Sequence, residues 1–300
     1  MSLDFFPGFD ERRIATPEAE IHARIGGSGP PLVCLHGFPQ THVAWRHVAA
    51  LLAARYTVVV PDLRGYGASE IVASAASHAA YSKRAMARDV IALMGALGFE
   101  RFAVAGHDRG GRVGYRLALD APQRVSALAT LDIVPTLDTW EAMDYRAAQR
   151  TYHWMFLAQP EPLPERLIGA DPDYYLDWTI GSWIESDDAI EPEAMQAYRD
   201  AFRRPAAIHA ACEDYRAGFS VDVENDRADR QAGRRIACPV LALWGGGPTT
   251  KNAGFDALGI WRSWANDVRG EAFPCGHFLM EELPARTADA LLAFFGQRAH

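Results

Sequence analysis

Short apolar segments alternate with longer helical segments between Ile21 and Asp132, and this alternation limits the possible folds more than any other feature of the chain. Three of the apolar segments have the length and composition of buried strands, at residues 31–35, 56–60 and 102–105. Each leads into a loop rich in Gly, Pro or Asp. The pattern is typical of a parallel sheet with helices on its faces. Because such sheets bind ligands beyond the carboxyl ends of their strands, we expect the functional site in these loops.

The character of the sequence changes after a fourth expected strand at residues 127–131. Residues 136–226 are rich in Trp, Tyr, Phe, Met and Pro and have helical rather than strand spacing. Strand character returns at residues 239–244, and a last helix is expected at residues 285–295. We therefore predict a core formed by residues 1–135 and 229–300, with an inserted helical cap at residues 136–228.

The charge balance of the 300-residue chain argues against some classes of partner. Acidic residues outnumber basic ones 38 to 30, which gives a formal net charge of −8. This balance disfavours binding to nucleic acid or to anionic membranes. No apolar run approaches the roughly 18 residues of a membrane span, and residues 1–13 do not resemble a signal peptide, so we expect a cytoplasmic protein. The cysteines lack the paired spacing of metal sites or disulfide scaffolds: Cys34, Cys212, Cys238 and Cys275.

The most informative chemical motif is Gly106-His107-Asp108-Arg109-Gly110, between an expected strand and an expected helix. This is the layout of a nucleophile elbow, with aspartate where esterases have serine. Glycines on both sides allow a sharp turn, and the carboxylate of Asp108 would lie at the positive end of a helix, ready to attack. The alternative is an aspartate that only caps the helix.

Two further segments occur in the chain order of a hydrolase. His36-Gly37-Phe38-Pro39 follows the first expected strand, where the backbone N–H of Phe38 could form an oxyanion hole with that of Arg109. Cys275-Gly276-His277-Phe278 precedes the last helix and provides His277 as a candidate general base. We interpret the glycine-rich residues 61–69 as a structural turn.

Three segments carry a family resemblance: residues 106–112, Tyr152-His153-Trp154 and residues 212–216, which are Cys-Glu-Asp-Tyr-Arg. The whole chain resembles the α/β-hydrolase superfamily, and these segments resemble the haloacetate dehalogenases, those that act on fluoroacetate in particular. The resemblance implies the α/β-hydrolase fold, a mostly parallel central sheet flanked by helices with an inserted helical cap. The aspartate elbow is shared with epoxide hydrolases and haloalkane dehalogenases, so the arginine pair and the His-Trp pair are the more specific signals.

The acid partner of His277 has two candidates. In many relatives the acid follows the late strand, but residues 244–250 contain no carboxylate, and the next acidic residue is Asp256. Asp132, at the end of the fourth expected strand, is the position that haloacetate dehalogenases use. The resemblance therefore implies a triad of Asp108, His277 and Asp132, with Asp256 as the alternative acid.

Arg109 and Arg112 are three residues apart at the start of one helix, so both side chains can lie on one face near Asp108. A neutral haloalkane or epoxide offers nothing to two buried guanidinium groups, whereas a carboxylate would satisfy both. We therefore predict that this pair binds a substrate carboxylate. The alternative is that these arginines form structural salt bridges.

Aromatic residues of the predicted cap are the candidate halide site. His153, Trp154 and Tyr215 offer N–H and O–H donors, and the resemblance assigns them to the leaving halide. Tyr215 would also serve an epoxide hydrolase, in which cap tyrosines protonate the epoxide oxygen, and the other alternative is simple aromatic packing. Trp183 and Phe38 are expected in the pocket wall, with core packing as their alternative.

These features predict an enzyme that converts haloacetates, such as fluoroacetate and chloroacetate, to glycolate and halide. Asp108 would displace the halide and form an ester, which water activated by His277 would hydrolyse. We expect no metal or organic cofactor, and no partner beyond the small haloacid and water, although the resemblance implies a homodimer. The alternatives are an epoxide hydrolase and a non-catalytic small-molecule receptor with a hydrolase fold.

Overall fold

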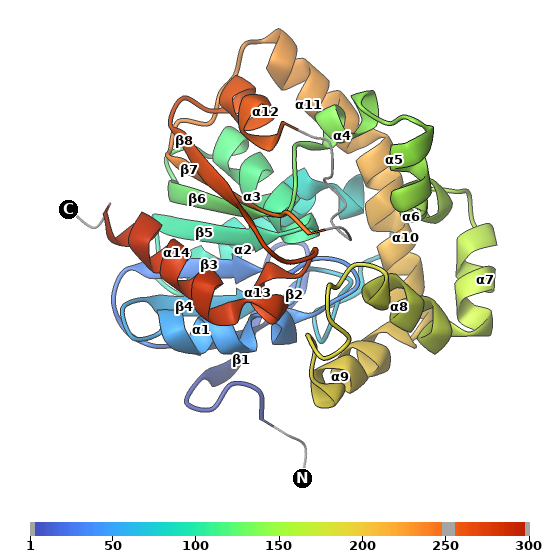
Figure 1. Ribbon diagram of the computed structural model, residues 1–300, viewed down its shortest axis with the longest axis horizontal. Coiled ribbons are helices and arrows are strands. Elements are labelled where there is room, and N and C mark those ends of the chain that lie inside the picture. The colour runs from blue at the N-terminus through green and yellow to red at the C-terminus, as the bar shows by residue number, and fades with distance from the viewer. Residues whose placement is uncertain (1–3, 248–255, 298–300) are drawn as a thin grey trace.

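The computed structural model describes residues 4–247 and 256–297 of the chain. Its strands form one sheet in the order β1-β2-β4-β3-β5-β6-β7-β8 (Figure 1). Strands β3 to β8 are parallel, whereas β2 runs antiparallel to β4 and β1 runs antiparallel to β2. The strand bounds are β1 Asp10–Ala15, β2 Glu20–Gly26, β3 Pro31–Leu35, β4 Thr57–Pro61, β5 Phe102–His107, β6 Val125–Leu131, β7 Val240–Gly245 and β8 Val268–Phe273.

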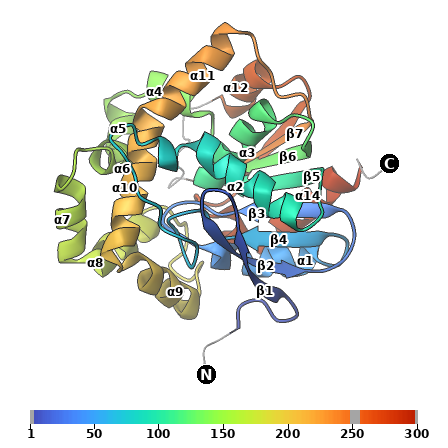
Figure 2. The same cartoon turned by 180° about the vertical axis from the view of Figure 1, so that it is seen from behind.

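Helices lie between most of the strands. The described helices are α1 Arg46–Leu52, α2 Lys83–Ala96, α3 Arg109–Asp120, α4 Thr136–Glu141, α5 Tyr145–Arg150, α6 Tyr152–Leu157, α7 Leu163–Ala170, α8 Pro172–Gly181, α9 Pro192–Phe202, α10 Pro205–Phe219, α11 Val221–Gln231, α12 Ala257–Trp264, α13 Leu279–Glu282 and α14 Pro284–Gly296, with short 3-10 turns at His42–Trp45 and Ala79–Tyr81. Helices α1 and α14 pack together in front of the sheet in Figure 1, and α2 and α3 pack together on its other face, which Figure 2 shows. The result is the sheet covered by helices that the sequence predicts.

The central strands are those that the sequence makes easiest to recognise. Strands β3, β4 and β5 are almost wholly buried, as expected for parallel strands covered on both faces. The five strands expected from the sequence correspond to β3 through β7, with small differences at their ends. Strands β1, β2 and β8 were not among the predicted elements. β1 is largely exposed and β8 alternates, so neither has the continuous apolar run of a buried strand.

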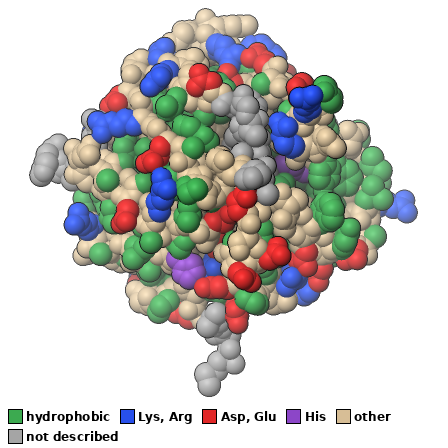
Figure 3. All heavy atoms as spheres, viewed as in Figure 1, with side chains coloured by type: hydrophobic (Ala, Val, Ile, Leu, Met, Phe, Trp, Pro, Cys, Tyr) green, Lys and Arg blue, Asp and Glu red, His purple; other side chains and the backbone are tan. Residues whose placement is uncertain are grey.

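Between β6 and β7 the chain forms helices α4 to α11, which begin at Thr136 and end at Gln231. In both ribbon views α5 to α10 gather beside one end of the sheet (Figures 1 and 2). The predicted cap at residues 136–228 covers nearly the same stretch, and the division into core and cap stays a prediction. Apolar side chains are exposed on α7 and α8, on the side of the molecule that lies to the right in Figure 3: Leu163, Leu167, Tyr174 and Trp178. None of the helices in the described parts of the chain combines the length and apolarity needed to cross a bilayer.

Asp62 fastens the loop after β4 to neighbouring segments. Its buried carboxylate accepts hydrogen bonds from Nδ1 of His22 and of His42, both at 2.9 Å, and from the backbone N–H groups of His42 and Ala68. Burial alone would raise the pKa of Asp62, but the charge on His42 and the histidine hydrogen bonds hold it well below its usual range. His22, His42 and Asp62 lie close enough to be metal ligands. Because both carboxylate oxygens already accept hydrogen bonds, we interpret these three residues as a structural hydrogen-bond network.

We expect a D62N variant to be less stable than the wild type at pH 7 by about 3–5 kcal/mol, because His22 and His42 lose the buried carboxylate to which both are hydrogen-bonded. A carboxyl whose folded pKa is lowered contributes stability above its unfolded pKa and loses it as the pH falls through the folded pKa. The difference should therefore shrink below about pH 4. Urea unfolding of both proteins over a pH series measures it. A difference that stays constant down to low pH would contradict the assignment of this stability to the Asp62 charge.

Candidate active site

Asp108 lies at the sharp turn between β5 and α3. Its backbone has φ 44° and ψ −117°, outside the regions that residues with a side chain usually adopt. A Cβ atom on Gly106 would lie 2.5 Å from the carbonyl oxygen of Gly110, and one on Gly110 would lie 2.4 Å from that of His36, so both positions require glycine. Asp108 occupies the N-cap position of α3, but its side chain makes no capping hydrogen bond. The carboxylate is therefore oriented for something other than capping.

The structure brings Asp108, His277 and Asp132 together. Nδ1 of His277 lies 2.5 Å from Oδ2 of Asp132, and its Nε2 lies 3.3 Å from Oδ2 of Asp108. Oδ1 of Asp132 accepts a hydrogen bond from the N–H of Gly245, and the N–H of His277 donates to the carbonyl of Trp183. All three side chains are buried. Because an ionised Asp132 can only accept, His277 donates from Nδ1, and its Nε2 is directed toward Asp108.

The other candidate acid, Asp256, is placed elsewhere. It is exposed and caps α12, where its carboxylate accepts from the N–H of Gly259. Of the acid-free loop noted in the sequence, residues 248–250 lie outside the described residues. His107, which the sequence analysis left without a chemical role, packs its ring 4.5 Å from the ring of His277 and donates from Nε2 to the His277 carbonyl.

The loop after β3 lies against the elbow. A Cβ atom on Gly37 would lie 2.4 Å from Cβ of Asp108 and 3.1 Å from the backbone nitrogen of Arg109. Phe38 follows directly. Among the described residues, neither the Phe38 nor the Arg109 backbone N–H has a hydrogen-bond acceptor. Both predicted oxyanion donors are therefore available close to the Asp108 carboxylate.

Arg109 is fully buried and poorly paired. None of its three guanidinium nitrogens has a hydrogen-bond partner among the described residues, and its closest carboxylate, Asp214, lies 3.7 Å away. The guanidinium carbon sits 3.5 Å from the centre of the Tyr215 ring and 5.0 Å from that of Trp154, so cation–π contacts take the place of hydrogen bonds. Burial would lower the pKa of Arg109, but the negative charge of Asp214 and the nearby Tyr215 raise it, so the group stays charged.

Asp214 has closer partners than Arg109. It forms an ion pair with Lys83 and accepts a hydrogen bond of 2.7 Å from the hydroxyl of Tyr66. The alternative role predicted for Arg109, a structural salt bridge, is therefore only weakly supported, because Asp214 would keep Lys83 and Tyr66 as partners without Arg109.

Arg112 is more firmly held. Its Nη1 donates to the carbonyl of Val134 at 2.9 Å and to Oγ1 of Thr136 at 3.1 Å, whereas its Nε has no partner. Its guanidinium carbon lies 4.5 Å from the centre of the Trp154 ring. Burial and the neighbouring charge of Arg109 lower the pKa of Arg112. A bound anion would relieve both effects.

A cavity of about 30 Å³ joins these groups. Five of the predicted site residues line it together with residues that the sequence analysis did not select: Asp108, Arg112, Asp132, Trp154 and His277, with Ile133, Thr139, Met143, Ala147 and Thr151. The last four of these lie on α4, in the loop after it, on α5 and directly after α5, so no single helix face in the sequence indicates them.

Arg109 is not among the residues that line the cavity, and the other predicted residues form an aromatic cluster beside it. The ring of His153 lies 4.7 Å from Trp183, 5.6 Å from Tyr215 and 6.3 Å from Phe38, and the ring of Trp183 lies 5.5 Å from His277. The hydroxyl of Tyr215 has no hydrogen-bond partner among the described residues. Of the three predicted halide donors, only Trp154 lines the cavity itself, and His153 and Tyr215 lie in the layer behind it.

Comparison with known proteins identifies the family of the chain. The model of the α/β hydrolase fold family matches residues 30–284. The chain belongs to the α/β-hydrolase family. This hydrolase is 45% identical to a fluoroacetate dehalogenase from Burkholderia sp., over 96% of its own length and 94% of the relative's. It is 34% identical to a soluble epoxide hydrolase from Corynebacterium sp. (strain C12), over 92% and 93% of the two chains.

The solved structures give the same picture of the fold. A structure from Nostoc sp. PCC 7120, provisionally described as an α/β hydrolase, superposes on this hydrolase with a TM-score of 0.93 and 48% identity, over 96% of this chain and 98% of that one. The molecule is therefore a hydrolase that resembles the haloacetate dehalogenases, and the epoxide hydrolase from Corynebacterium sp. is a more distant relative.

Proposed function

We propose that this hydrolase removes the halogen from haloacetates, fluoroacetate and chloroacetate among them, and releases glycolate and halide. The observation that carries the proposal is the pair of buried guanidinium groups beside Asp108, one of which has no hydrogen bond at any nitrogen to the residues that the structure describes. Each unsatisfied buried N–H costs about 1–3 kcal/mol. A substrate carboxylate would recover that cost through charge-assisted hydrogen bonds, and it would turn its α-carbon toward Asp108.

In the first step an oxygen of Asp108 attacks the α-carbon of the substrate. The new C–O bond forms as the carbon–halogen bond breaks, and the halide leaves with the bonding electron pair. Trp154, with His153 and Tyr215 behind it, offers N–H and O–H donors for the charge that develops on the halide. The product is an ester in which an oxygen of Asp108 is bonded to the former α-carbon of the substrate.

In the second step His277 takes a proton at Nε2 from a water molecule, and the hydroxide attacks the carboxyl carbon of the Asp108 ester. Asp132 stabilises the imidazolium through its 2.5 Å hydrogen bond to Nδ1. The backbone N–H groups of Phe38 and Arg109 stabilise the oxyanion. When the ester bond breaks, His277 returns the proton to the glycolate oxygen. The new carboxylic acid of Asp108 then loses the proton of the added hydroxyl to solvent, which restores the carboxylate.

The lining of the cavity favours a small acid over an epoxide. The guanidinium of Arg112 lies in the wall beside Asp108, where it would bind a carboxylate but has no charged group to bind in styrene oxide. The hydroxyl of Tyr215, which has no hydrogen-bond partner in the described parts of the chain, and the epoxide hydrolase relative favour epoxide opening as the second candidate. A receptor without turnover would not require a histidine held between Asp132 and Asp108 as His277 is. A homodimer is also part of the proposal. The exposed apolar side chains of α7 and α8 form a surface that would be buried between two copies of the chain.

The test is to incubate the protein separately with fluoroacetate, chloroacetate and styrene oxide. We expect halide and glycolate in equal amounts from the haloacetates and no diol from the epoxide. Ion chromatography and mass spectrometry measure all products. Diol without halide would identify an epoxide hydrolase, and the absence of any product would favour the receptor.

A further inference from the structure

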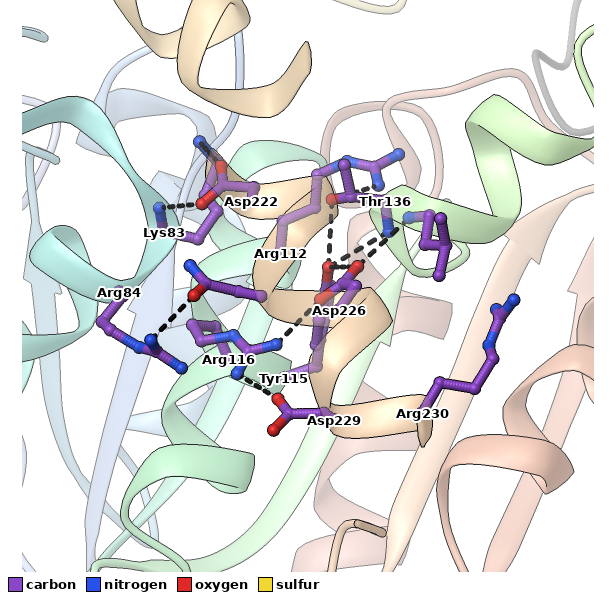
Figure 4. Close-up of polar contacts among 12 residues, drawn as sticks. Lys83, Arg84, Arg112, Tyr115, Arg116, Thr136, Asp222, Asp226, Asp229 and Arg230 are labelled. Carbon is purple, nitrogen blue, oxygen red and sulfur yellow. Dashed lines mark hydrogen bonds and ion pairs between the residues drawn. The ribbon is translucent and has the colours of Figure 1, made fainter. Parts of the chain in front are cut away.

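Arg112 is the guanidinium that lines the cavity, and its orientation depends on a threonine outside that cavity. Nη1 of Arg112 donates to Oγ1 of Thr136, the first residue of α4 (Figure 4). A threonine hydroxyl can either accept this hydrogen bond or turn its own hydrogen toward the guanidinium, and only the first arrangement is attractive. What fixes the hydroxyl of Thr136 therefore helps to orient Arg112, together with the carbonyl of Val134 and Oγ1 of Thr139.

The neighbouring tyrosine decides the direction of that hydroxyl. The hydroxyl of Tyr115 lies 2.7 Å from Oδ2 of Asp226 and 3.0 Å from Oγ1 of Thr136 (Figure 4). A phenol has one hydrogen to donate, and the carboxylate is the nearer and stronger acceptor. The oxygen of Tyr115 is then left to accept from the hydroxyl and from the backbone N–H of Thr136. The lone pairs of Thr136 consequently face Arg112.

Asp226 is held in turn by groups around it. Its Oδ1 accepts from Arg116 at 2.8 Å, and its Oδ2 accepts from the backbone N–H of Leu137 at 3.1 Å. Arg116 also pairs with Asp229, one turn further along α11. Burial and the charge of Asp226 raise the pKa of Tyr115 well above its usual range, so the phenol keeps its hydrogen. The chain of contacts runs from α11 through α3 to α4, three elements that are distant in sequence.

We propose that Asp226 is a positioning residue for substrate binding, acting through Tyr115 and Thr136 to orient the guanidinium of Arg112 toward the substrate carboxylate. The inference rests on the proposed function, because it assigns that carboxylate to Arg112. A purely structural role would end at the ion pair between Asp226 and Arg116. The contacts from Asp226 through Tyr115 and Thr136 to Arg112, which we call the relay, make a different prediction. Loss of the Tyr115 hydroxyl alone, with the ion pair intact, should weaken binding of the substrate carboxylate.

Three variants separate these roles. Y115F removes the relay hydroxyl and leaves the ion pair, and D226N lets an amide donate to Tyr115, which turns the hydroxyl of Tyr115 toward Thr136 and reverses the relay. We expect both to raise KM for fluoroacetate about tenfold with a much smaller change in kcat. D229N is the matched control, since Asp229 pairs with the same Arg116 but does not contact Tyr115. It should lose stability and keep KM.

Binding of glycolate, measured calorimetrically on each variant, gives a second readout that needs no turnover. Weaker glycolate binding by Y115F than by D229N supports the relay. If wild-type protein releases no halide but binds glycolate, the proposed reaction fails while the relay is still tested. Unchanged KM and unchanged glycolate binding in Y115F would overturn the inference, as would a wild-type protein that binds no glycolate.

Discussion

An H277N variant is expected to release one halide ion per active site from fluoroacetate and then stop. Asparagine cannot take a proton from water, so the first displacement proceeds and the ester on Asp108 persists. Steady-state turnover should fall by a factor on the order of 10³, while the initial burst of fluoride remains. Intact-mass analysis after the burst should show the protein heavier by one carboxymethyl group, and peptide mapping should place that group on Asp108. D132A should behave similarly, because His277 loses the group that orients Nδ1.

The matched control is D108N, which lacks the attacking carboxylate and should release no halide at all. H277N leaves the ester bond unbroken and D108N leaves the carbon–halogen bond unbroken, so together the two variants test the order of the steps. A burst without an adduct would contradict the ester intermediate. Equal and complete loss of fluoride release in H277N and D108N would instead assign His277 to the first step.

The parts of the fold that the sequence predicts are those in which burial is continuous. Strand β5 is buried at every position and β3 at nearly every one, so composition and length are enough to identify them. Strand β1 has the opposite pattern, since most of its residues are exposed and charged. It is a strand because β2 pairs with it along its whole length, and that pairing is a tertiary contact that no local pattern contains.

The residues of the site also differ in how far the sequence alone can predict them. Asp108 is evident because a turn this sharp demands glycines at fixed offsets, and that demand is visible in the sequence. The choice between Asp132 and Asp256 came only from a family resemblance, because 145 positions separate Asp132 from His277 and no spacing rule reaches that far. Tyr115 and Asp226 are ordinary residue types in ordinary helices, so they become notable only when α3 and α11 are seen side by side.

Replacing Arg109 with methionine is expected to lower kcat/KM for fluoroacetate by a factor on the order of 10² to 10³ without lowering the melting temperature. The loss of activity follows from removing a buried partner of the substrate carboxylate. Stability should hold or rise because Arg109 makes no hydrogen bond among the described residues, and burying a guanidinium costs several kcal/mol when its nitrogens are unpaired. Methionine fills similar space against Tyr215 and Trp154 and has no charge to desolvate.

The comparison that decides the role of Arg109 is K83M, because Lys83 and Arg109 both approach Asp214. Lys83 forms the closer pair and also approaches Asp222, so its loss leaves two buried carboxylates short of a cation and should cost about 3–5 kcal/mol of stability. If Arg109 were a structural partner, R109M would lower the melting temperature in the same manner as K83M. A site built to receive an anion predicts the opposite, since the guanidinium of Arg109 has no hydrogen-bond acceptor among the described residues and a substrate carboxylate would supply one. Thermal unfolding of both variants, with and without glycolate, should therefore show that glycolate stabilises K83M more than R109M.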